Sequence, residues 1–110
     1  MQLSKKVLID ISEDASNSTG VQTDGLLLSG IVFPAAMTGS NVTFDFAFDG
    51  STWVDVVETD GTEVTYTVSA GNVTRVDPSG WAFASSGFLR VVSGSAEAAD
   101  RDIKLIFRTA

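Results

Sequence analysis

The 110-residue sequence contains neither cysteine nor histidine, and these absences exclude several kinds of chemistry. Without cysteine the chain cannot form a disulfide framework, a cysteine–zinc site or a thiol nucleophile. Without histidine it lacks the commonest general base. We therefore predict a fold that is stable without covalent or metal cross-links, with no cofactor, no metal ligand and no catalytic residue.

Basic residues are also scarce. Seven Lys and Arg stand against fourteen Asp and Glu, which gives a net charge of −7. The seven are scattered, and because nucleic-acid backbones reward clustered cations, we expect no nucleic-acid partner. An acidic chain is a poor ligand for anionic lipid, and no apolar stretch has the length of a membrane span, so we expect no membrane partner. The first ten residues lack the apolar run of a signal peptide, which favours synthesis in the cytoplasm without export through a cleaved signal.

The composition that remains is that of a globular all-β protein. Hydrophobic residues make up 44% and charged residues 19% of the chain. Valine, threonine and phenylalanine are abundant, and no window shows a sustained helical period. We predict one domain over residues 1–110, with a main sandwich over 25–108. Residues 1–24 should supply a strand followed by an exposed arm or loop.

The clearest strand pattern runs from Asn41 to Val68. Its first strand has four apolar residues on one face, at Val42, Phe44, Phe46 and Phe48. A three-residue loop over 49–51 sets Phe46 opposite Val54, and the next inward pair is then Phe44 and Val56. A loop of two or four residues would carry the Asp55 carboxylate into the core, which costs several kcal/mol, so we reject those registers.

The same reasoning extends to a second hairpin. A loop over 59–61 places Val56 opposite Val64 and Val54 opposite Tyr66. The result is a three-stranded meander with one apolar face, and such a face needs a second sheet to cover it. With about eight strands in all, we predict a two-sheet antiparallel β-sandwich, jelly-roll-like in its connections.

The remaining strands show one apolar face or two. Residues 1–12 alternate, with Leu3, Val7, Ile9 and Ile11 on one side, and residues 102–108 alternate likewise. We expect these two strands to lie in the sheet that faces the meander. Residues 25–33 are apolar on both faces, and Gly30 predicts a bulge. Residues 13–24 and 93–101 should be long exposed loops, and residues 81–86 a helical turn or an irregular loop.

The predicted register creates one candidate charged site, because Asp45 and Asp55 face each other on the outer side of the sheet. Like charges across a ladder repel, and a calcium ion could hold them. The surrounding residues do not match an EF-hand loop, so we prefer a solvated pair whose side chains splay apart. Glycan hydrolysis by paired carboxylates needs a cleft, for which a domain of this size has little room.

The two tryptophans form the second candidate site. Trp53 should lie on the outer face, and Trp81 should lie in or beside a loop. Packing at the rim of the core is the commonest role for such residues, followed by contact with another subunit. A sugar-stacking platform is the third interpretation.

Several motifs together resemble a known family. They are Phe33-Pro34-Ala35-Ala36, Val42-Thr43-Phe44, Asp49-Gly50-Ser51-Thr52-Trp53, Ser93-Gly94-Ser95, and the segment from Ala98 to Leu105. Over residues 25–108 the chain resembles small virion proteins of tailed bacteriophages, of the capsid decoration (cement) type or related head and tail accessory proteins. The resemblance implies a β-sandwich without enzymatic activity, often a homotrimer, that binds the major capsid protein on the outside of the virion and bridges capsomers.

This resemblance sets expectations for the interfaces. The expected protein-interface residues are Leu26, Leu28, Trp53, Trp81 and Phe83. The segments 13–24 and 93–101 are the candidates for binding the capsid. The alternative is a carbohydrate-binding module of a phage fibre or adhesin, which exposed and coplanar Trp53 and Trp81 would favour.

Overall fold

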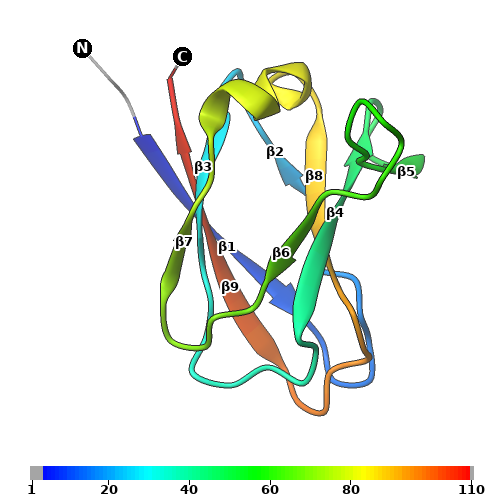
Figure 1. The fold of residues 1–110 in the computed structure, drawn as a ribbon, viewed down its shortest axis with the longest axis vertical. Coiled ribbons are helices and arrows are strands. Elements are labelled where there is room, and N and C mark those ends of the chain that lie inside the picture. The colour runs from blue at the N-terminus through cyan, green and yellow to red at the C-terminus, as the bar shows by residue number, and fades with distance from the viewer. Residues whose placement is uncertain (1–3, 110) are drawn as a thin grey trace.

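Two antiparallel sheets face each other in the computed structural model, which describes residues 4–109 (Figure 1). The four-stranded sheet has the order β1 (Ser4–Ile11), β9 (Arg101–Arg108), β3 (Leu27–Val32) and β7 (Val73–Arg75). The five-stranded sheet begins β2 (Val21–Gln22), β8 (Phe88–Ser93) and β4 (Asn41–Ala47). At its far edge β5 (Trp53–Asp55) and β6 (Thr65–Thr67) both pair with β4. Leu3, predicted to belong to the first strand, lies outside the described residues.

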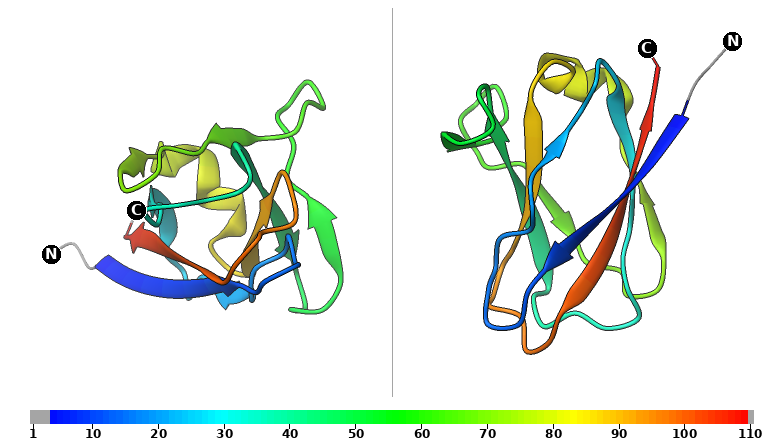
Figure 2. Two further views of the ribbon diagram at one scale, coloured as in Figure 1. Left: turned by 90° about the horizontal axis from the view of Figure 1, so that it is seen from below. Right: turned by 180° about the vertical axis from the view of Figure 1, so that it is seen from behind.

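The strand pairs are nested. The first strand pairs with the last (β1 with β9), then β2 pairs with β8, β3 with β7, and β4 with β5 and β6. A long double-stranded ribbon that wraps into two sheets in this way is a jelly roll, so the predicted fold class is confirmed. Figure 2 shows β1 and β9 side by side along their length, with the start of β1 and the end of β9 at the same end of the molecule.

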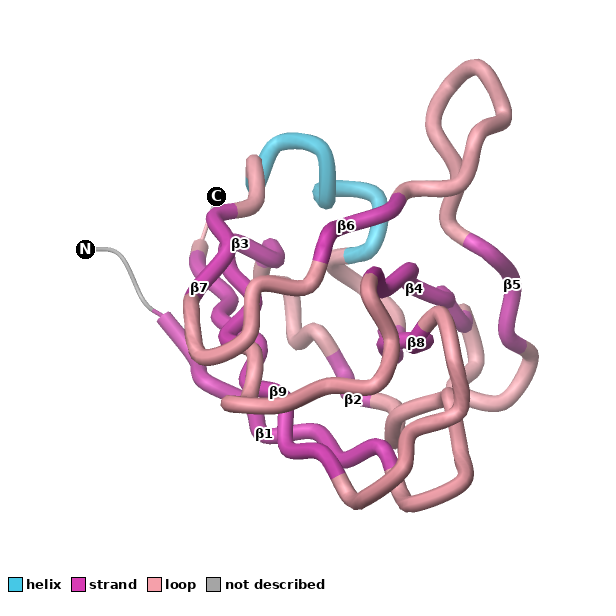
Figure 3. Tube along the Cα trace, turned by 60° about the horizontal axis from the view of Figure 1, so that its bottom comes forward, coloured by secondary structure: helices cyan, strands magenta, loops and turns pink. Residues whose placement is uncertain are grey.

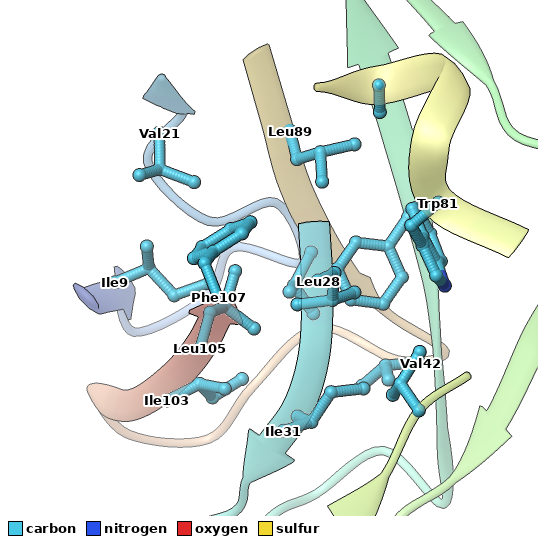
Figure 4. Packing of buried hydrophobic residues seen from close by; sticks show 14 of the residues in the cluster. Ile9, Val21, Leu28, Ile31, Val42, Trp81, Leu89, Ile103, Leu105 and Phe107 are labelled. Carbon is cyan, nitrogen blue, oxygen red and sulfur yellow. The ribbon is translucent and has the colours of Figure 1, made fainter. Parts of the chain in front are cut away.

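The core lies between the sheets and follows from the alternation of each strand. Ile103, Leu105 and Phe107 point inward from β9 and are fully buried. They pack with residues of the opposite sheet, as Figure 4 shows for Leu89 and Val42. Burying one such side chain contributes about 1.5–3 kcal/mol. The two terminal strands therefore lie in the sheet that faces β4, as predicted.

Strand β3 lies inside its sheet, between β9 and β7, and it buries residues of both parities. Leu28 and Ile31 belong to the core, and Leu27 on the other side is only 8% exposed. The pairing with β9 shifts register between Leu28 and Gly30. This irregularity is the bulge that the glycine predicted, and it lets the strand bury residues of both parities.

The first hairpin has the predicted register, and so does the start of the second, where Val56 lies opposite Val64, but the meander does not continue to Tyr66. Phe46 lies opposite Val54, and Val64 N–H donates to Val56 O at 3.1 Å. Tyr66, expected opposite Val54, instead pairs with Val42 on β4. Strand β5 covers only half of the free edge of β4, and β6 pairs with the other half. The connection between β5 and β6 consequently projects from the body (Figure 3).

The polar run over residues 13–24 is not a free arm, and this corrects the prediction. It contains β2 and follows β8, with Ser18 N–H donating to Val91 O and Ser93 N–H to Ser16 O, both at 2.8 Å. Ser18 and Thr23 are buried, and the Thr23 hydroxyl donates to Ala84 O at 2.7 Å. Short hydroxyl side chains can satisfy buried backbone groups, so a polar segment can pack as the edge strand of this sheet.

Two residues predicted to face the core lie on the surface. Phe48 is 82% exposed and Val54 is 56% exposed. The strand alternation places them on the inner side as expected, but the four-stranded sheet does not reach the edge formed by β5. Only the 3-10 helix η1 (Pro78–Ala84) partly covers that edge.

Candidate protein-binding surface

Helix η1 closes one end of the sandwich through Trp81. The Asp77 side chain accepts a hydrogen bond from Ser79 N–H and caps the helix, and Pro78 follows in the first turn. Trp81 is 4% exposed, and its ring lies 4.9 Å from that of Phe44 in the core. Its indole N–H donates to the Tyr66 hydroxyl at 3.1 Å. The helix is therefore held to the core by a satisfied, buried aromatic anchor.

An apolar patch lies beside this helix, formed by Phe46, Phe48, Val54, Val57 and Phe83. Among the described residues, four of the six exposed large hydrophobic side chains belong to it. The Phe46 ring lies 6.1 Å from that of Phe48 and 5.7 Å from that of Phe83, which joins the two most exposed rings into one surface. Contiguous exposed apolar surface of this kind marks interaction sites.

A groove of about 460 Å³ continues the apolar patch between η1 and the hairpin that follows β5. It is lined by Val56, Val57, Glu58, Thr59, Val64, Tyr66, Asp77, Gly80, Trp81 and Phe83. The pKa of Tyr66 is raised, and burial is the largest cause. The hydrogen bond from Trp81 lowers the pKa, and the charges of Glu58 and Asp77 raise it. The groove is thus apolar along its walls and negative at its rim.

Trp53 lies on the opposite, outer face of the five-stranded sheet. It is half-buried and lies beside Ala47, whose small side chain leaves room for the indole. The Arg90 guanidinium carbon lies 4.6 Å from the ring centre, within cation–π distance. At the far side a β-carbon on Gly20 would come within 2.8 Å of the ring. Trp53 therefore covers its own sheet and does not stand free.

Asp45 and Asp55 are opposite each other, as predicted, but they are not a solvated pair. Asp45 is only 7% exposed, and Arg90 Nε donates to its Oδ2 at 2.9 Å. Burial raises the pKa of Asp45, the Arg90 interaction lowers it, and Asp55 raises it again, so that the net pKa lies above the ordinary value. Arg90, on the neighbouring strand β8, is the partner that reasoning from one hairpin missed.

A second acidic pair joins the two terminal strands. Asp10 faces Asp102 in the register of β1 and β9. The pKa of Asp10 is raised, first by a hydrogen bond with Asp102 and then by desolvation and the charges of Asp102 and Asp100. The pairing of the first strand with the last would have predicted this Asp10–Asp102 pair from the sequence. Within residues 4–109, no group of three or more carboxylates is arranged to hold a metal ion.

The expected interface residues divide into two groups. Leu28 is 1% exposed and Trp81 is 4% exposed, so both are core residues and neither is available to a partner. This corrects the prediction, and the reason is that β3 is central and η1 folds inward. Leu26 and Trp53 are partly buried, and Phe83, at 54% exposed, is the member of the set that lies on the apolar patch. Sequence reasoning missed Phe48 and Val54 as surface residues because the strand alternation placed both on the inward face.

Comparisons with known proteins support the fold. No protein-family model matches the chain, and no curated protein sequence matches it. Among solved structures, the crystal structure of the SPBc2 prophage-derived protein YomS is similar, with a TM-score of 0.55 and 12% sequence identity over 97% of this chain and 96% of that chain. Among residues 4–109, no helix has the length and apolar character needed to cross a membrane. At this identity the likeness establishes a shared whole-chain jelly-roll fold.

Proposed function

We propose that this chain is a structural protein of a bacteriophage particle, and that within the particle it decorates the capsid and bridges capsomers. The observation that carries the proposal is the fold match with a prophage-derived protein, which spans nearly the whole of both chains. The resemblance of residues 25–108 to capsid decoration proteins supports the capsid as the location. The partner on this proposal is the major capsid protein, and the chain acts as a homo-oligomer, most simply a trimer.

The surface features favour binding to protein. The apolar patch is large enough to place two exposed phenylalanine rings, Phe48 and Phe83, against a partner. Aromatic side chains are enriched at the centres of protein interfaces. The Asp45 carboxylate, in contrast, is paired with Arg90 on a face of the sheet, an arrangement that favours a structural role for this carboxylate.

The arrangement of the tryptophans speaks against the carbohydrate-binding alternative. That function requires Trp53 and Trp81 to be exposed and coplanar on one surface. Trp81 instead packs against Phe44 on the inner side of the sheet, and Trp53 lies on the outer side. A glycan array tests this directly, and a specific glycan signal that Trp53→Ala abolishes would favour the adhesin function.

Immunogold electron microscopy tests the location. Antibody raised against the purified protein is applied to particles purified from an induced culture of the strain that encodes it. The proposal predicts regular gold labelling of heads, and antibody pre-absorbed with the protein is the control. Labelling confined to tails would retain a virion role and reject decoration of the capsid, while unlabelled particles would reject both.

Light scattering of the purified protein tests the assembly state. A homotrimer predicts a mass about three times that of the 11.6 kDa chain. A strict monomer at every concentration would contradict self-association in solution. Heating capsids that lack the protein, with and without added protein, then measures reinforcement directly.

A further inference from the structure

The charge around the apolar patch identifies the kind of surface that fits it. From Phe48 to Val68 the chain carries five carboxylates, at positions 49, 55, 58, 60 and 63, and no Lys or Arg. Glu58 and Asp77 line the groove itself. Arg75 and Arg108 border a different groove, which shares Asp77 with this one. An apolar centre with a rim of one charge sign selects partners of the opposite sign.

We propose that the apolar patch and its groove bind a segment of another protein in which a large apolar side chain is flanked by Lys or Arg. The apolar side chain packs against Phe83 and Val57, and the flanking cations lie near Glu58 and Asp77. Exposed phenylalanine rings add a second attraction, because cations bind over aromatic faces. The assignment of this segment to another virion protein rests on the proposed function. The chemistry of the segment follows from the apolar patch alone.

A second copy of this chain is a poor occupant of the same surface. A two-fold contact between identical patches brings the same residues together. The carboxylates of Glu58, Asp60 and Glu63 would then lie on both sides of the interface, and like charges in an interface oppose association. The charge pattern therefore favours a basic partner over self-association through this face.

The patch is built on fixed elements. Trp81, at the floor of the groove, is stacked against Phe83 with ring centres 5.7 Å apart and is hydrogen-bonded to Tyr66. The hairpin wall is held by Glu58 N–H donating to Thr62 O at 2.7 Å. A rigid surface loses little conformational entropy on binding, which favours affinity from few contacts.

Selection from a random library tests the partner chemistry without assuming a sequence. Random 12-residue peptides displayed on yeast are selected against the immobilised full-length protein at low salt. We expect enriched peptides to combine an aromatic or large aliphatic residue with Lys or Arg. A library that yields no enrichment, or enriches peptides without basic residues, would overturn the proposal.

Variants then place the binding. Titration of a synthetic enriched peptide should show at least about tenfold weaker binding to Phe48→Ser and to Glu58→Lys. The controls are Leu8→Ser and Val73→Ser, which remove exposed apolar residues elsewhere (56% and 55% exposed, against 82% for Phe48), and Glu13→Lys, which makes the same charge change on another exposed loop. The controls should bind within about twofold of the unmodified protein. Equal loss in controls and patch variants would contradict the proposed site.

Two further readouts separate the possible failures. Chemical shifts of ¹⁵N-labelled protein on adding the peptide should change around Val57 and Phe83, and changes confined to the Trp53 face would overturn the site. A dimer that Phe48→Ser abolishes would show that a second copy occupies the patch. If gold labels the particles but no basic peptide binds, the virion role stands and this inference fails. If a basic peptide binds but the particles are not labelled, only the virion role is rejected.

Discussion

The carboxylate of Glu97 lies over the backbone of Gly39, whose N–H donates to Oε2 at 2.9 Å. Thr38 N–H donates to the other oxygen at 2.8 Å, and the Ser93 hydroxyl and Arg101 Nε donate at 2.6 and 2.9 Å. The Glu97 side chain has no exposed surface. One buried charge thus fixes the loop before β4 to the connection between β8 and β9, at the end of the sandwich away from η1.

Replacing this carboxylate should be among the most destabilising polar changes in the chain. Glu97→Gln keeps the shape but turns one acceptor into a donor, which then faces N–H groups and the Arg101 guanidinium. We expect a loss of about 3 kcal/mol in the free energy of unfolding, measured by urea denaturation. Glu63→Gln, at an exposed position, is the control and should change stability by less than about 0.5 kcal/mol. Similar values for the two variants would mean that the Glu97 network contributes little.

The same residue gives stability a defined pH dependence. Burial alone would raise the pKa of Glu97, but hydrogen bonds from Ser93, Thr38, Gly39 and Arg101 lower it to about 2. A carboxyl whose pKa is lower in the folded state stabilises the fold fully above its unfolded pKa, near 4.5, and loses this contribution as the pH falls through the folded value. The stability difference between the unmodified protein and Glu97→Gln should therefore be constant above pH 5 and shrink toward pH 2. A difference that grows on acidification would contradict the assignment.

Gly39 itself is required by space rather than by backbone conformation. A β-carbon there would overlap the Ser93 hydroxyl oxygen and lie 3.1 Å from the backbone nitrogen of Gly94. Gly39→Ala should therefore lower the free energy of unfolding by about 1–3 kcal/mol. Gly80→Ala is the matched control, because a β-carbon at that glycine meets nothing within 4 Å. Thermal melts of both variants should separate, and coincident melts would show that the loop yields without cost.

Strand alternation was sufficient to predict the fold class and one hairpin register. Phe44 was paired with Val56 because a loop of two or four residues would have buried the Asp55 carboxylate. The terminal strands were assigned correctly to the facing sheet because each has one apolar face. These predictions depend on the period of two along a strand, which is a local property of the sequence.

The same alternation could not predict which strands pair when they lie far apart in the sequence. Tyr66 satisfies the alternation equally well opposite Val54 or opposite Val42, and only the unfilled edge of β4 decides between them. Glutamate and arginine are usually surface residues. Glu97 contacts Thr38 and Arg90 contacts Asp45, and in each pair the two residues lie more than forty positions apart in the sequence. Phe48 lies on the surface because the opposite sheet does not extend over it. The pattern of one strand cannot predict where the opposite sheet ends.

Arg90 should stabilise the fold chiefly by neutralising Asp45. Arg90→Gln leaves a carboxylate that is 7% exposed without its cation and beside Asp55, so we expect a loss of about 2 kcal/mol at pH 7. The pKa of Asp45 is already raised, by burial first and by Asp55, and it should rise further in the variant. Because a raised carboxyl pKa destabilises the fold only where the group is ionised, the loss should be smaller at pH 3.5 than at pH 7.

A double variant separates the charge from the contact with Trp53. Asp45→Asn combined with Arg90→Gln removes both charges, so it should recover the pH-dependent part of the loss and leave the part due to stacking, about 0.5–1 kcal/mol. Arg75→Gln, at an exposed position, controls for the change in net charge. Urea denaturation of the unmodified protein, Arg90→Gln, Asp45→Asn alone, the double variant and Arg75→Gln at both pH values measures the coupling. If Arg90→Gln loses the same amount at pH 3.5 and pH 7, its contribution comes from packing on Trp53 and not from the Asp45 charge.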